Sequence, residues 1–417
     1  MTYDVDAIRS HFPALATGTA FFDAPGGSQV PDVVADAIHR SLVAGISNRG
    51  QVTAAERGAD DIVTAGRAAM ADLLGADPGG IVFGRSMTQL TYDFARTLAQ
   101  TWRPGDEVVV TRLDHDANIR PWLQAAAAVG GTVRWVEFDP ATGELTTDQV
   151  AAQLSDRTRL VAVTGASNLI GTRPPLAQIG RLVHDAGALF FVDGVHLTAH
   201  EPVDVAAIGA DLFACSPYKF LGPHCGVLAG RPELLAELRP DKLLPSTDDV
   251  PEKFELGTLP YELLAGTTAA VDFIADLCTS APAAPVTGPG SAPVAGPAAG
   301  RRERLVASMT AAAAHELQLR SCIEDQLAEF PSVRVHSRAA ERTPTLLLTF
   351  DGGDAAAAYR YLAERGINAP AGSFYAIEAS RWLGLGGSGG LRIGLAPYTN
   401  ADDVSRLLDG LTEFLAS

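Results

Sequence analysis

The stretch ALFFVDGVH, residues 188–196, joins five apolar residues to an aspartate, Asp193. A short apolar run of this kind predicts a strand that is buried on both faces of a parallel sheet. Similar runs are IVFG (81–84), EVVVTR (107–112), TVRWVEF (132–138), RLVAVTG (159–165), DLFACS (211–216) and GVLAG (226–230). Amphipathic helical patterns such as PWLQAAAAVG and LAQIGRLVHDAG separate several of them. We therefore predict an α/β domain with a mostly parallel, seven-stranded sheet.

The rest of the chain predicts how the protein is divided into domains. Residues 1–20 are expected to form an N-terminal arm that packs with a small domain, and residues 21–278 the large domain. Residues 279–300 are uncharged and rich in Pro, Gly, Ala and Ser, which predicts a disordered insertion. Residues 301–417 begin with a long helical pattern, continue with the strands TPTLLLTF and GLRIGLAPY, and end in a helix. They predict a smaller α+β C-terminal domain.

Composition limits the classes of function. The formal charge of −17 argues against nucleic acid or an anionic membrane surface as a partner. The four cysteines have no CxxC spacing, which fits a reduced intracellular protein and indicates no metal site. The N-terminus lacks the apolar core of a secretion signal, and no apolar run reaches the length of a membrane span. We expect a cytoplasmic protein.

Ligands of such sheets bind beyond the carboxyl ends of the strands. Ser86 follows the run IVFG (81–84) and is expected to cap a helix that Met87 and Thr88 open. The N-terminus of this helix would suit a phosphate. His115 follows the run EVVVTR (107–112). It is either a core histidine with satisfied hydrogen bonds or an imidazole that stacks on the ring of a ligand. Asn168, after RLVAVTG, is either a turn residue or a hydrogen-bond partner of a ligand oxygen.

Asp193 and the stretch SPYKFLGPHCG (216–226) complete the set. A buried Asp193 needs a cationic partner, which would be a structural ion pair or a protonated ring nitrogen. Lys219 is one of only three lysines among 32 basic residues. A lysine in an apolar pocket has a lowered pKa and becomes a nucleophile that forms a Schiff base. A phosphate anchor, a ring-covering His115, a carboxylate and this lysine together match pyridoxal phosphate.

The motifs RSMT, DHDAN, SNLIGT, VDGVH, SPYKFLGPH, FELGT and LRIGLAPYTN occur in this order. In this combination the chain resembles the class V aminotransferases, and within them the cysteine desulfurase-like group, over nearly its whole length except the insertion. The resemblance implies a pyridoxal-phosphate-dependent transferase fold of type I, with a large cofactor-binding domain and a smaller C-terminal one.

The resemblance also implies roles for individual residues of the cofactor site. Lys219 would form the Schiff base and His115 would stack on the ring, and both are expected to be catalytic. Asp193 would pair with the pyridine nitrogen. The other expected cofactor contacts are Asn168 and His196 at the 3′ oxygen, and Ser86, Met87, Thr88, Ser216 and Tyr218 around the phosphate. Relatives that serve sulfur assembly usually have Gln at the position of His196, and many have Thr at that of Met87.

Further roles concern the substrate and the partner subunit. Thr258, in FELGT, would reach the phosphate of a neighbouring subunit, so the resemblance implies a homodimer with shared active sites. Arg392 would bind the substrate α-carboxylate. Strand alternation supports this role independently, because Leu391 and Ile393 would point to one side and Arg392 to the other. Asn48 and Tyr375 are the other predicted substrate-binding residues.

One feature departs from the desulfurases. Tyr375 aligns with their mobile catalytic Cys, and no cysteine follows Cys322; Cys225 is expected to be buried and inert. We therefore predict β-elimination at a C–S bond of a cysteine-like amino acid. The alternatives are an aminotransferase or epimerase on another amino acid, a true desulfurase with a non-standard cysteine, and a non-catalytic binding protein. A nicotinamide-dependent dehydrogenase is disfavoured, because GLGGSG (384–389) precedes a strand instead of following one.

Overall fold

Seven strands form one sheet in the computed structural model, which describes residues 2–279 and 299–416. In spatial order they are β3 (Ile81–Gly84), β9 (Gly226–Gly230), β8 (Leu212–Cys215), β7 (Leu189–Asp193), β6 (Thr158–Thr164), β4 (Glu107–Thr111) and β5 (Thr132–Val136). The pairings from β8 to β5 are parallel, and β9 runs antiparallel to both β8 and β3. The predicted α/β class and the mostly parallel seven-stranded sheet are confirmed.

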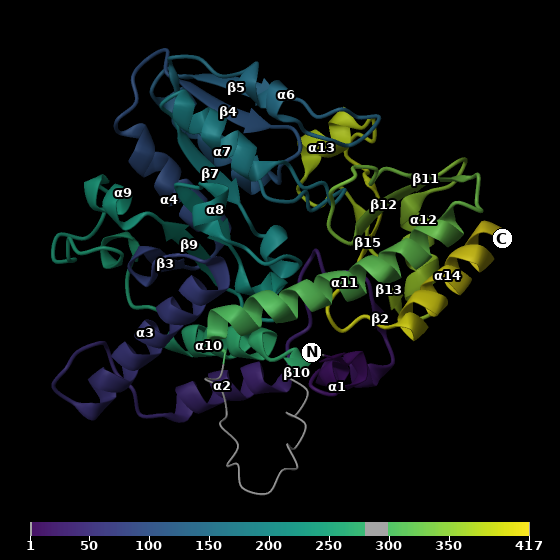
Figure 1. The fold of residues 1–417 in the computed structure, drawn as a ribbon, viewed down its shortest axis with the longest axis horizontal. Coiled ribbons are helices and arrows are strands. Elements are labelled where there is room, and N and C mark those ends of the chain that lie inside the picture. The colour runs from purple at the N-terminus through teal and green to yellow at the C-terminus, as the bar shows by residue number, and fades with distance from the viewer. Residues whose placement is uncertain (1, 280–298, 417) are drawn as a thin grey trace, which may run out of the picture.

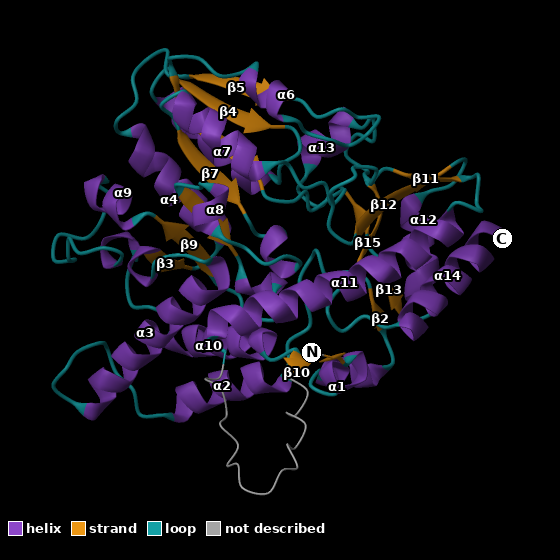
Figure 2. Ribbon diagram, in the orientation of Figure 1, coloured by secondary structure: helices purple, strands orange, loops and turns teal. Residues whose placement is uncertain are grey.

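Helices cover both faces of this sheet (Figures 1 and 2). The helices of this part of the chain are α2 (Asp32–Val43), α3 (Ala54–Leu74), α4 (Met87–Ala99), α5 (Arg120–Ala128), α6 (Thr147–Ala151), α7 (Leu176–Asp185), α8 (Val205–Ile208), α9 (Pro232–Glu237) and α10 (Tyr261–Ala275). Successive strand residues enter different cores, as the pleat requires. Phe190 belongs to the core that includes Ile179 of α7, and Phe191 to the core that includes Trp122 of α5. Burial on both faces explains the apolar runs of the other strands, whereas β5 lies at the edge of the sheet with Thr132 and Arg134 exposed.

The C-terminal residues build a second, antiparallel sheet. Its order is β11 (Val333–Val335), β12 (Thr345–Phe350), β15 (Gly390–Gly394) and β14 (Ala371–Gly372). The helices here are α11 (Arg301–Leu327), α12 (Ala355–Ala363), α13 (Ile377–Trp382) and α14 (Ala401–Ala416). Leu391 and Ile393 of β15 enter the core of this part, as strand alternation predicts.

The N-terminal residues touch distant parts of the chain. β1 (Thr2–Tyr3) pairs with β10 (Cys278–Thr279), and β2 (Ala20–Phe21) pairs with β13 (Ile367–Asn368). α1 (Val5–Arg9) ends in Arg9, whose Nη1 lies 2.6 Å from the Asp403 carboxylate of α14. The domain limits given above stay a prediction, and residues 280–298 of the predicted insertion lie outside the described residues.

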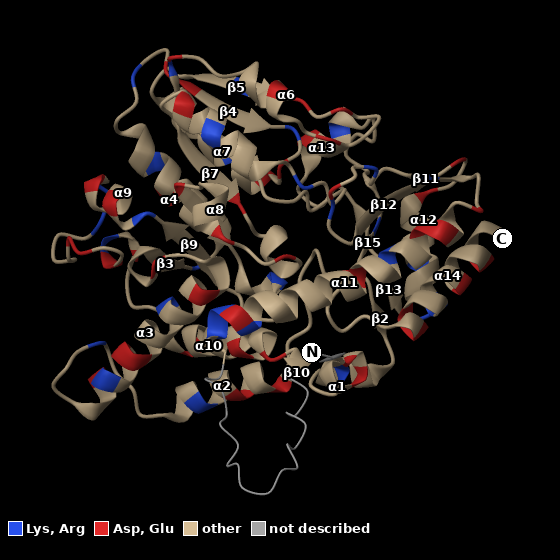
Figure 3. Cartoon of the chain, in the orientation of Figure 1, with Lys and Arg blue, Asp and Glu red and all other residues tan. Residues whose placement is uncertain are grey.

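Helix α11 links the two sheets along the chain (Figure 1). Basic and acidic positions lie together where it starts beside α10 (Figure 3). Arg301 contacts Asp72 of α3 at 2.8 Å and Asp272 of α10 at 3.2 Å, and Arg302 Nη1 donates to the Leu73 carbonyl at 2.9 Å. These contacts hold the start of α11 against α3 and α10. No helix of the described residues is long and apolar enough to cross a membrane.

Candidate active site

A cavity of about 650 Å³ lies beyond the carboxyl ends of β6, β7 and β8 and reaches β15 of the small domain. Twelve predicted site residues line it: Ser86, Met87, Thr88, His115, Asn168, Asp193, His196, Ser216, Tyr218, Lys219, Tyr375 and Arg392. Asn48 and Thr258 do not line it; both are exposed elsewhere on this chain. The structure thus brings together residues that are far apart in sequence. They meet at the carboxyl ends of the strands, where ligands are expected.

Lys219 enters the cavity from a short 3₁₀ turn after β8. Its Nζ donates hydrogen bonds to the carbonyls of Pro25 at 2.6 Å and Gly26 at 3.0 Å. Burial, reinforced by the positive charge of Arg392 and opposed by Asp193, lowers the pKa of Lys219 to about 7. A large fraction of this amine is therefore unprotonated at neutral pH, which is the form that attacks an aldehyde.

Asp193 ends β7 and is almost fully buried. Its Oδ1 accepts a hydrogen bond from the Val195 amide at 3.0 Å. Within residues 2–279 and 299–416 no basic side chain forms an ion pair with it, so the structure does not show the structural ion pair weighed above. Burial raises the pKa of Asp193 to about 6, opposed by the Val195 amide and Lys219. A cationic ligand nitrogen would satisfy this carboxylate.

His115 lies in the loop after β4 with a defined tautomer. Its Nδ1 accepts a hydrogen bond from the Ala117 amide at 3.0 Å, so the proton of the neutral ring is on Nε2. Burial first, then Lys219 and Arg392, lower the pKa of His115 to about 4. The ring therefore stays neutral and can lie flat against an aromatic ligand. The Tyr375 ring stacks on it at 5.5 Å between centroids.

Asp114 holds the His115 loop and was missed by the sequence reasoning. It is fully buried and accepts hydrogen bonds from Asn118 Nδ2 at 2.6 Å and from the Thr111 hydroxyl. Burial raises the pKa of Asp114 to about 8, so the carboxyl is mostly protonated at neutral pH. Trp122 Nε1 donates to Asn118 Oδ1 at 3.1 Å and extends this network into α5. The only sequence signal was an acidic residue three positions after the end of a buried strand.

The N-terminus of α4 faces the same cavity. Ser86 is its N-cap and accepts a hydrogen bond from the Gln89 amide at 3.1 Å, and the helix begins at Met87 as predicted. The first amides of a helix have no acceptor within the helix, and its N-terminal end is positive. Ser216 and Tyr218 line the cavity with Met87 and Thr88. This surface suits a phosphate.

Arg392 projects from β15 into the cavity with only 2 % of its surface exposed. Its Nη1 donates to the Asn168 carbonyl at 3.0 Å, and the Phe374 ring centroid lies 3.6 Å from the guanidinium carbon. No acidic residue of the described chain forms an ion pair with it. Burial lowers its pKa to about 9, opposed by Asp23, so it remains a cation at neutral pH. A buried guanidinium without a carboxylate is a binding site for one.

The segment with Phe374 and Tyr375 forms one wall of the cavity, with Tyr375 76% exposed. Asn168 Nδ2 donates to the Phe374 carbonyl at 2.9 Å, and the Asp116 amide donates to the Tyr375 carbonyl at 2.8 Å. Both residues have positive φ, +51° and +60°. Backbone of this kind costs free energy and persists where the surroundings hold it. Phe374 was not among the predicted site residues, because a contact across the domains leaves no local pattern.

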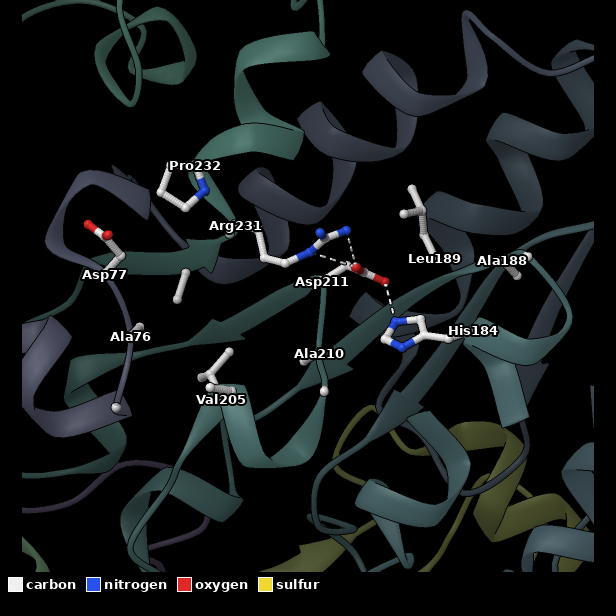
Figure 4. Close-up of a pocket in the computed structure, with 16 residues that line it drawn as sticks. Ala76, Asp77, His184, Ala188, Leu189, Val205, Ala210, Asp211, Arg231 and Pro232 are labelled. Carbon is white, nitrogen blue, oxygen red and sulfur yellow. Dashed lines mark hydrogen bonds and ion pairs between the residues drawn. The ribbon is translucent and has the colours of Figure 1, made fainter. Parts of the chain in front are cut away.

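A second cavity, of about 560 Å³, lies at the amino ends of β7 and β8, opposite the active-site cavity. Figure 4 shows Asp211 between Arg231 and His184 in it. Asp211 is buried and accepts from Arg231 Nη2 at 2.6 Å, His184 Nε2 at 3.1 Å and the Phe190 amide at 2.7 Å. This cluster is satisfied internally and ties β7 and β8 to the end of β9. In the described part of the chain, no group of three or more His, Cys, Asp or Glu residues could hold a metal ion.

The cavity residues fit pyridoxal phosphate. Lys219 provides the unprotonated amine, Asp193 an unpaired carboxylate for the ring nitrogen, and neutral His115 a flat face for the ring. The α4 N-terminus provides amides for the phosphate, and Arg392 remains for a substrate carboxylate. Each requirement of the cofactor is met by a group that lacks another charged partner among the described residues.

Comparison with known proteins gives concordant results. The family described as Aminotransferase class-V matches residues 20–284 and 303–407. A cysteine desulfurase of Dickeya dadantii is 31% identical over 98% of this chain and 96% of its own. An uncharacterised protein of Mycobacterium tuberculosis is 33% identical over 99% of both chains. The crystal structure of the cysteine desulfurase CsdA from Escherichia coli superposes with a TM-score of 0.84 at 28% identity, covering 100% of this chain and 99% of that one.

The low pKa of Lys219 predicts how the protein takes up pyridoxal phosphate. The reaction is followed by the visible absorption band of the linkage between the cofactor aldehyde and Lys219. The initial rate at which this band appears should rise with pH around a midpoint near 7, because only the unprotonated amine reacts. In Arg392→Gln the midpoint should move to higher pH, since a positive charge that disfavours protonation of Lys219 is removed. Arg334→Gln, on the edge strand β11, is the control and should keep the wild-type midpoint. A midpoint near 10.5 in the wild-type protein would contradict this account of the cavity.

Proposed function

Since the chain belongs to the class V aminotransferase family and to its cysteine desulfurase-like group, we propose that it cleaves a carbon–sulfur bond of a cysteine-like amino acid by β-elimination. The protein is a pyridoxal-phosphate-dependent enzyme with the fold of the cysteine desulfurases. One observation carries the choice of reaction: none of the four cysteines lines the active-site cavity.

The four thiols are poorly placed to accept sulfur. Cys215, Cys225 and Cys278 are buried, and Cys322 is exposed on α11. Burial raises the pKa of Cys225 to about 11 and that of Cys215 well above its usual value. The thiolate is the nucleophilic form of cysteine, so neither residue would attack a substrate sulfur at neutral pH. With all four thiols free, we propose a reducing compartment, the cytoplasm, as the place of action.

The wall at Phe374 and Tyr375 further supports elimination. A persulfide carrier must move between the substrate and an acceptor. Here the aligned Tyr375 is held by the Asp116 amide and by stacking on His115. The neighbouring α13 is tied to the large domain, because Glu378 contacts Arg120 at 2.6 Å and Arg112 at 3.2 Å. We infer that this segment shapes the pocket and does not carry sulfur.

The cavity residues supply what elimination requires. When bound, the cofactor acts as an electron sink for the bonds of the substrate Cα. Arg392 would bind the α-carboxylate and orient Cα–H towards Lys219. The Lys219 amine would take the Cα proton, the Cβ–S bond would break, and the sulfur would leave as a thiolate that regains a proton. Hydrolysis of the unsaturated amino acid left behind gives pyruvate and ammonia.

A second candidate is epimerisation of, or amino transfer from, another amino acid. It is favoured by one observation: Tyr375 adds a phenol to the cavity, and epimerisation needs an acid besides Lys219. The two candidates differ in products, because only elimination releases pyruvate and a thiol.

Elimination predicts that cofactor-loaded protein releases pyruvate from L-cysteine, L-cystine or an S-substituted cysteine. Lys219→Ala should lower kcat by about 10²–10⁴-fold, the usual contribution of a general base. Cys322→Ser should keep the wild-type rate, whereas a desulfurase that uses its single exposed thiol would lose sulfide release. Alanine without pyruvate from cysteine, or α-deuterium exchange without elimination, would contradict the proposal.

We also propose that the enzyme is a homodimer with shared active sites. Asn48 and Thr258 are exposed, and Arg49 joins their segments by a 3.0 Å contact with Glu252. Exposed apolar side chains of the same segments are Leu42, Val43, Val52 and Leu256. Apolar surface of this kind favours a protein partner, and a second copy would place Thr258 near a phosphate site.

A charge in this surface should separate the subunits. Leu256→Asp should convert a dimer to a monomer in light scattering and weaken the retention of pyridoxal phosphate on dialysis. Leu317→Asp is the matched control, because Leu317 is also half-exposed but lies on α11, and it should leave the dimer intact. A wild-type protein that is monomeric with cofactor bound and turning over would contradict the shared site.

A further inference from the structure

His196 connects the active-site cavity to the small domain. It is buried with 3% exposure and lines the cavity. Its Nε2 lies 3.0 Å from Thr343 Oγ1 and 2.9 Å from Thr345 Oγ1. Its Nδ1 makes no hydrogen bond with any described residue. One ring nitrogen is therefore committed to the two threonines, and the other is left for a ligand.

The two threonines are held rigidly in place. The Thr343 amide donates to the Gly171 carbonyl at 2.9 Å. Gly171 has φ of +75°, and a Cβ there would lie 3.0 Å from the carbonyls of both threonines, so only glycine allows this approach. Arg320 of α11 donates to the Thr343 carbonyl at 3.3 Å. Both side chains are buried, so their hydroxyls are preorganised for the imidazole.

These contacts bear on which nitrogen of His196 carries the proton. Burial lowers the pKa of His196 well below its usual value, and the charges of His200, Arg392 and Lys219 act in the same direction. The ring is therefore neutral, with one donor and one acceptor. The Thr343 hydroxyl has another acceptor, the Gly171 carbonyl at 3.4 Å. Among the described residues the one hydrogen-bond acceptor available to the Thr345 hydroxyl is His196 Nε2, at 2.9 Å, and donation to it would place the proton on Nδ1.

The buried pair His200 and Glu316 packs against another side of the His196 ring. The His200 ring meets the His196 ring at 4.8 Å between centroids and 73° between planes. Its own Nδ1 lies 2.9 Å from Glu316 Oε2, and both side chains are almost fully buried. With the threonines at Nε2 and His200 against the ring, His196 has little freedom to turn.

We propose that Thr345, assisted by Thr343, is a positioning residue that keeps the proton of His196 on Nδ1, so that His196 donates a hydrogen bond to the ring oxygen of bound pyridoxal phosphate. The identity of this acceptor rests on the proposed cofactor placement; the tautomer does not. The ring oxygen carries negative charge, and a donor there weakens its hold on the adjacent proton of the cofactor–Lys219 linkage. The small domain, through Thr345 of β12, thus influences the cofactor by way of His196.

Titration of the visible absorption band of the loaded protein tests this without measuring activity. In Thr345→Val and in the double variant Thr343→Val/Thr345→Val the midpoint of this pH titration should rise, because the cofactor–Lys219 linkage then holds its proton more strongly. The expected rise is about half to one pH unit, the size of one lost hydrogen bond. Thr345→Ser keeps the hydroxyl and should titrate like wild type. Thr349→Val is the matched control, because Thr349 lies on the same strand and bonds His336 Nε2 at 2.9 Å away from the cavity.

Nitrogen-15 NMR of histidine-labelled protein without cofactor reports the tautomer itself, with His196→Gln for assignment. Protonated Nδ1 in wild type, and loss of this preference in the double variant, would support the proposal. Protonated Nε2 in wild type would overturn it, as would an equal shift of the midpoint in Thr349→Val. If the tautomer is as proposed but the midpoints do not move, the placement of the ring oxygen is wrong and not the role of Thr345.

Discussion

Two basic side chains, Lys219 and Arg392, share one buried cavity, and the chemistry of the site depends on the different protonation of the two. Burial and the neighbouring guanidinium lower the pKa of Lys219 to about 7, which makes it a nucleophile. Arg392 keeps its charge because its pKa falls only to about 9. Asp193 is the carboxylate that faces them. The cavity therefore offers a reactive amine beside a fixed positive charge, which suits an aldehyde cofactor and an amino-acid carboxylate.

This balance requires the two domains to stay together. Lys219 follows a strand of the large sheet, and Arg392 lies on a strand of the small one. Contacts that join the domains at the cavity include those of Arg392 with the Asn168 carbonyl, Asn168 with the Phe374 carbonyl, and His196 with Thr345. Because the same residues line the cavity and join the domains, loss of one contact should disturb both substrate binding and the cofactor environment.

The sequence predicted what local patterns encode. Continuous apolar runs located the seven strands, the rarity of lysine pointed to Lys219, and strand alternation placed Arg392 opposite Leu391 and Ile393. It could not predict contacts made only by the fold. His196 and Thr345 are 149 residues apart, and the Phe374 ring lies over Arg392 through a loop of unusual backbone. Asn48 and Thr258 do not reach the cavity of this chain, so their roles stay predictions that depend on a second subunit.

One lysine, Lys219, is expected to carry the chemistry of the site. The most direct test is borohydride reduction of the cofactor-loaded protein, followed by digestion and mass spectrometry of the lysine-containing peptides. With only three lysines in the chain, each site can be scored separately. We predict a pyridoxyl group on Lys219 alone, at close to one per chain. Label on Lys242 or Lys253, or no label on Lys219, would contradict the account.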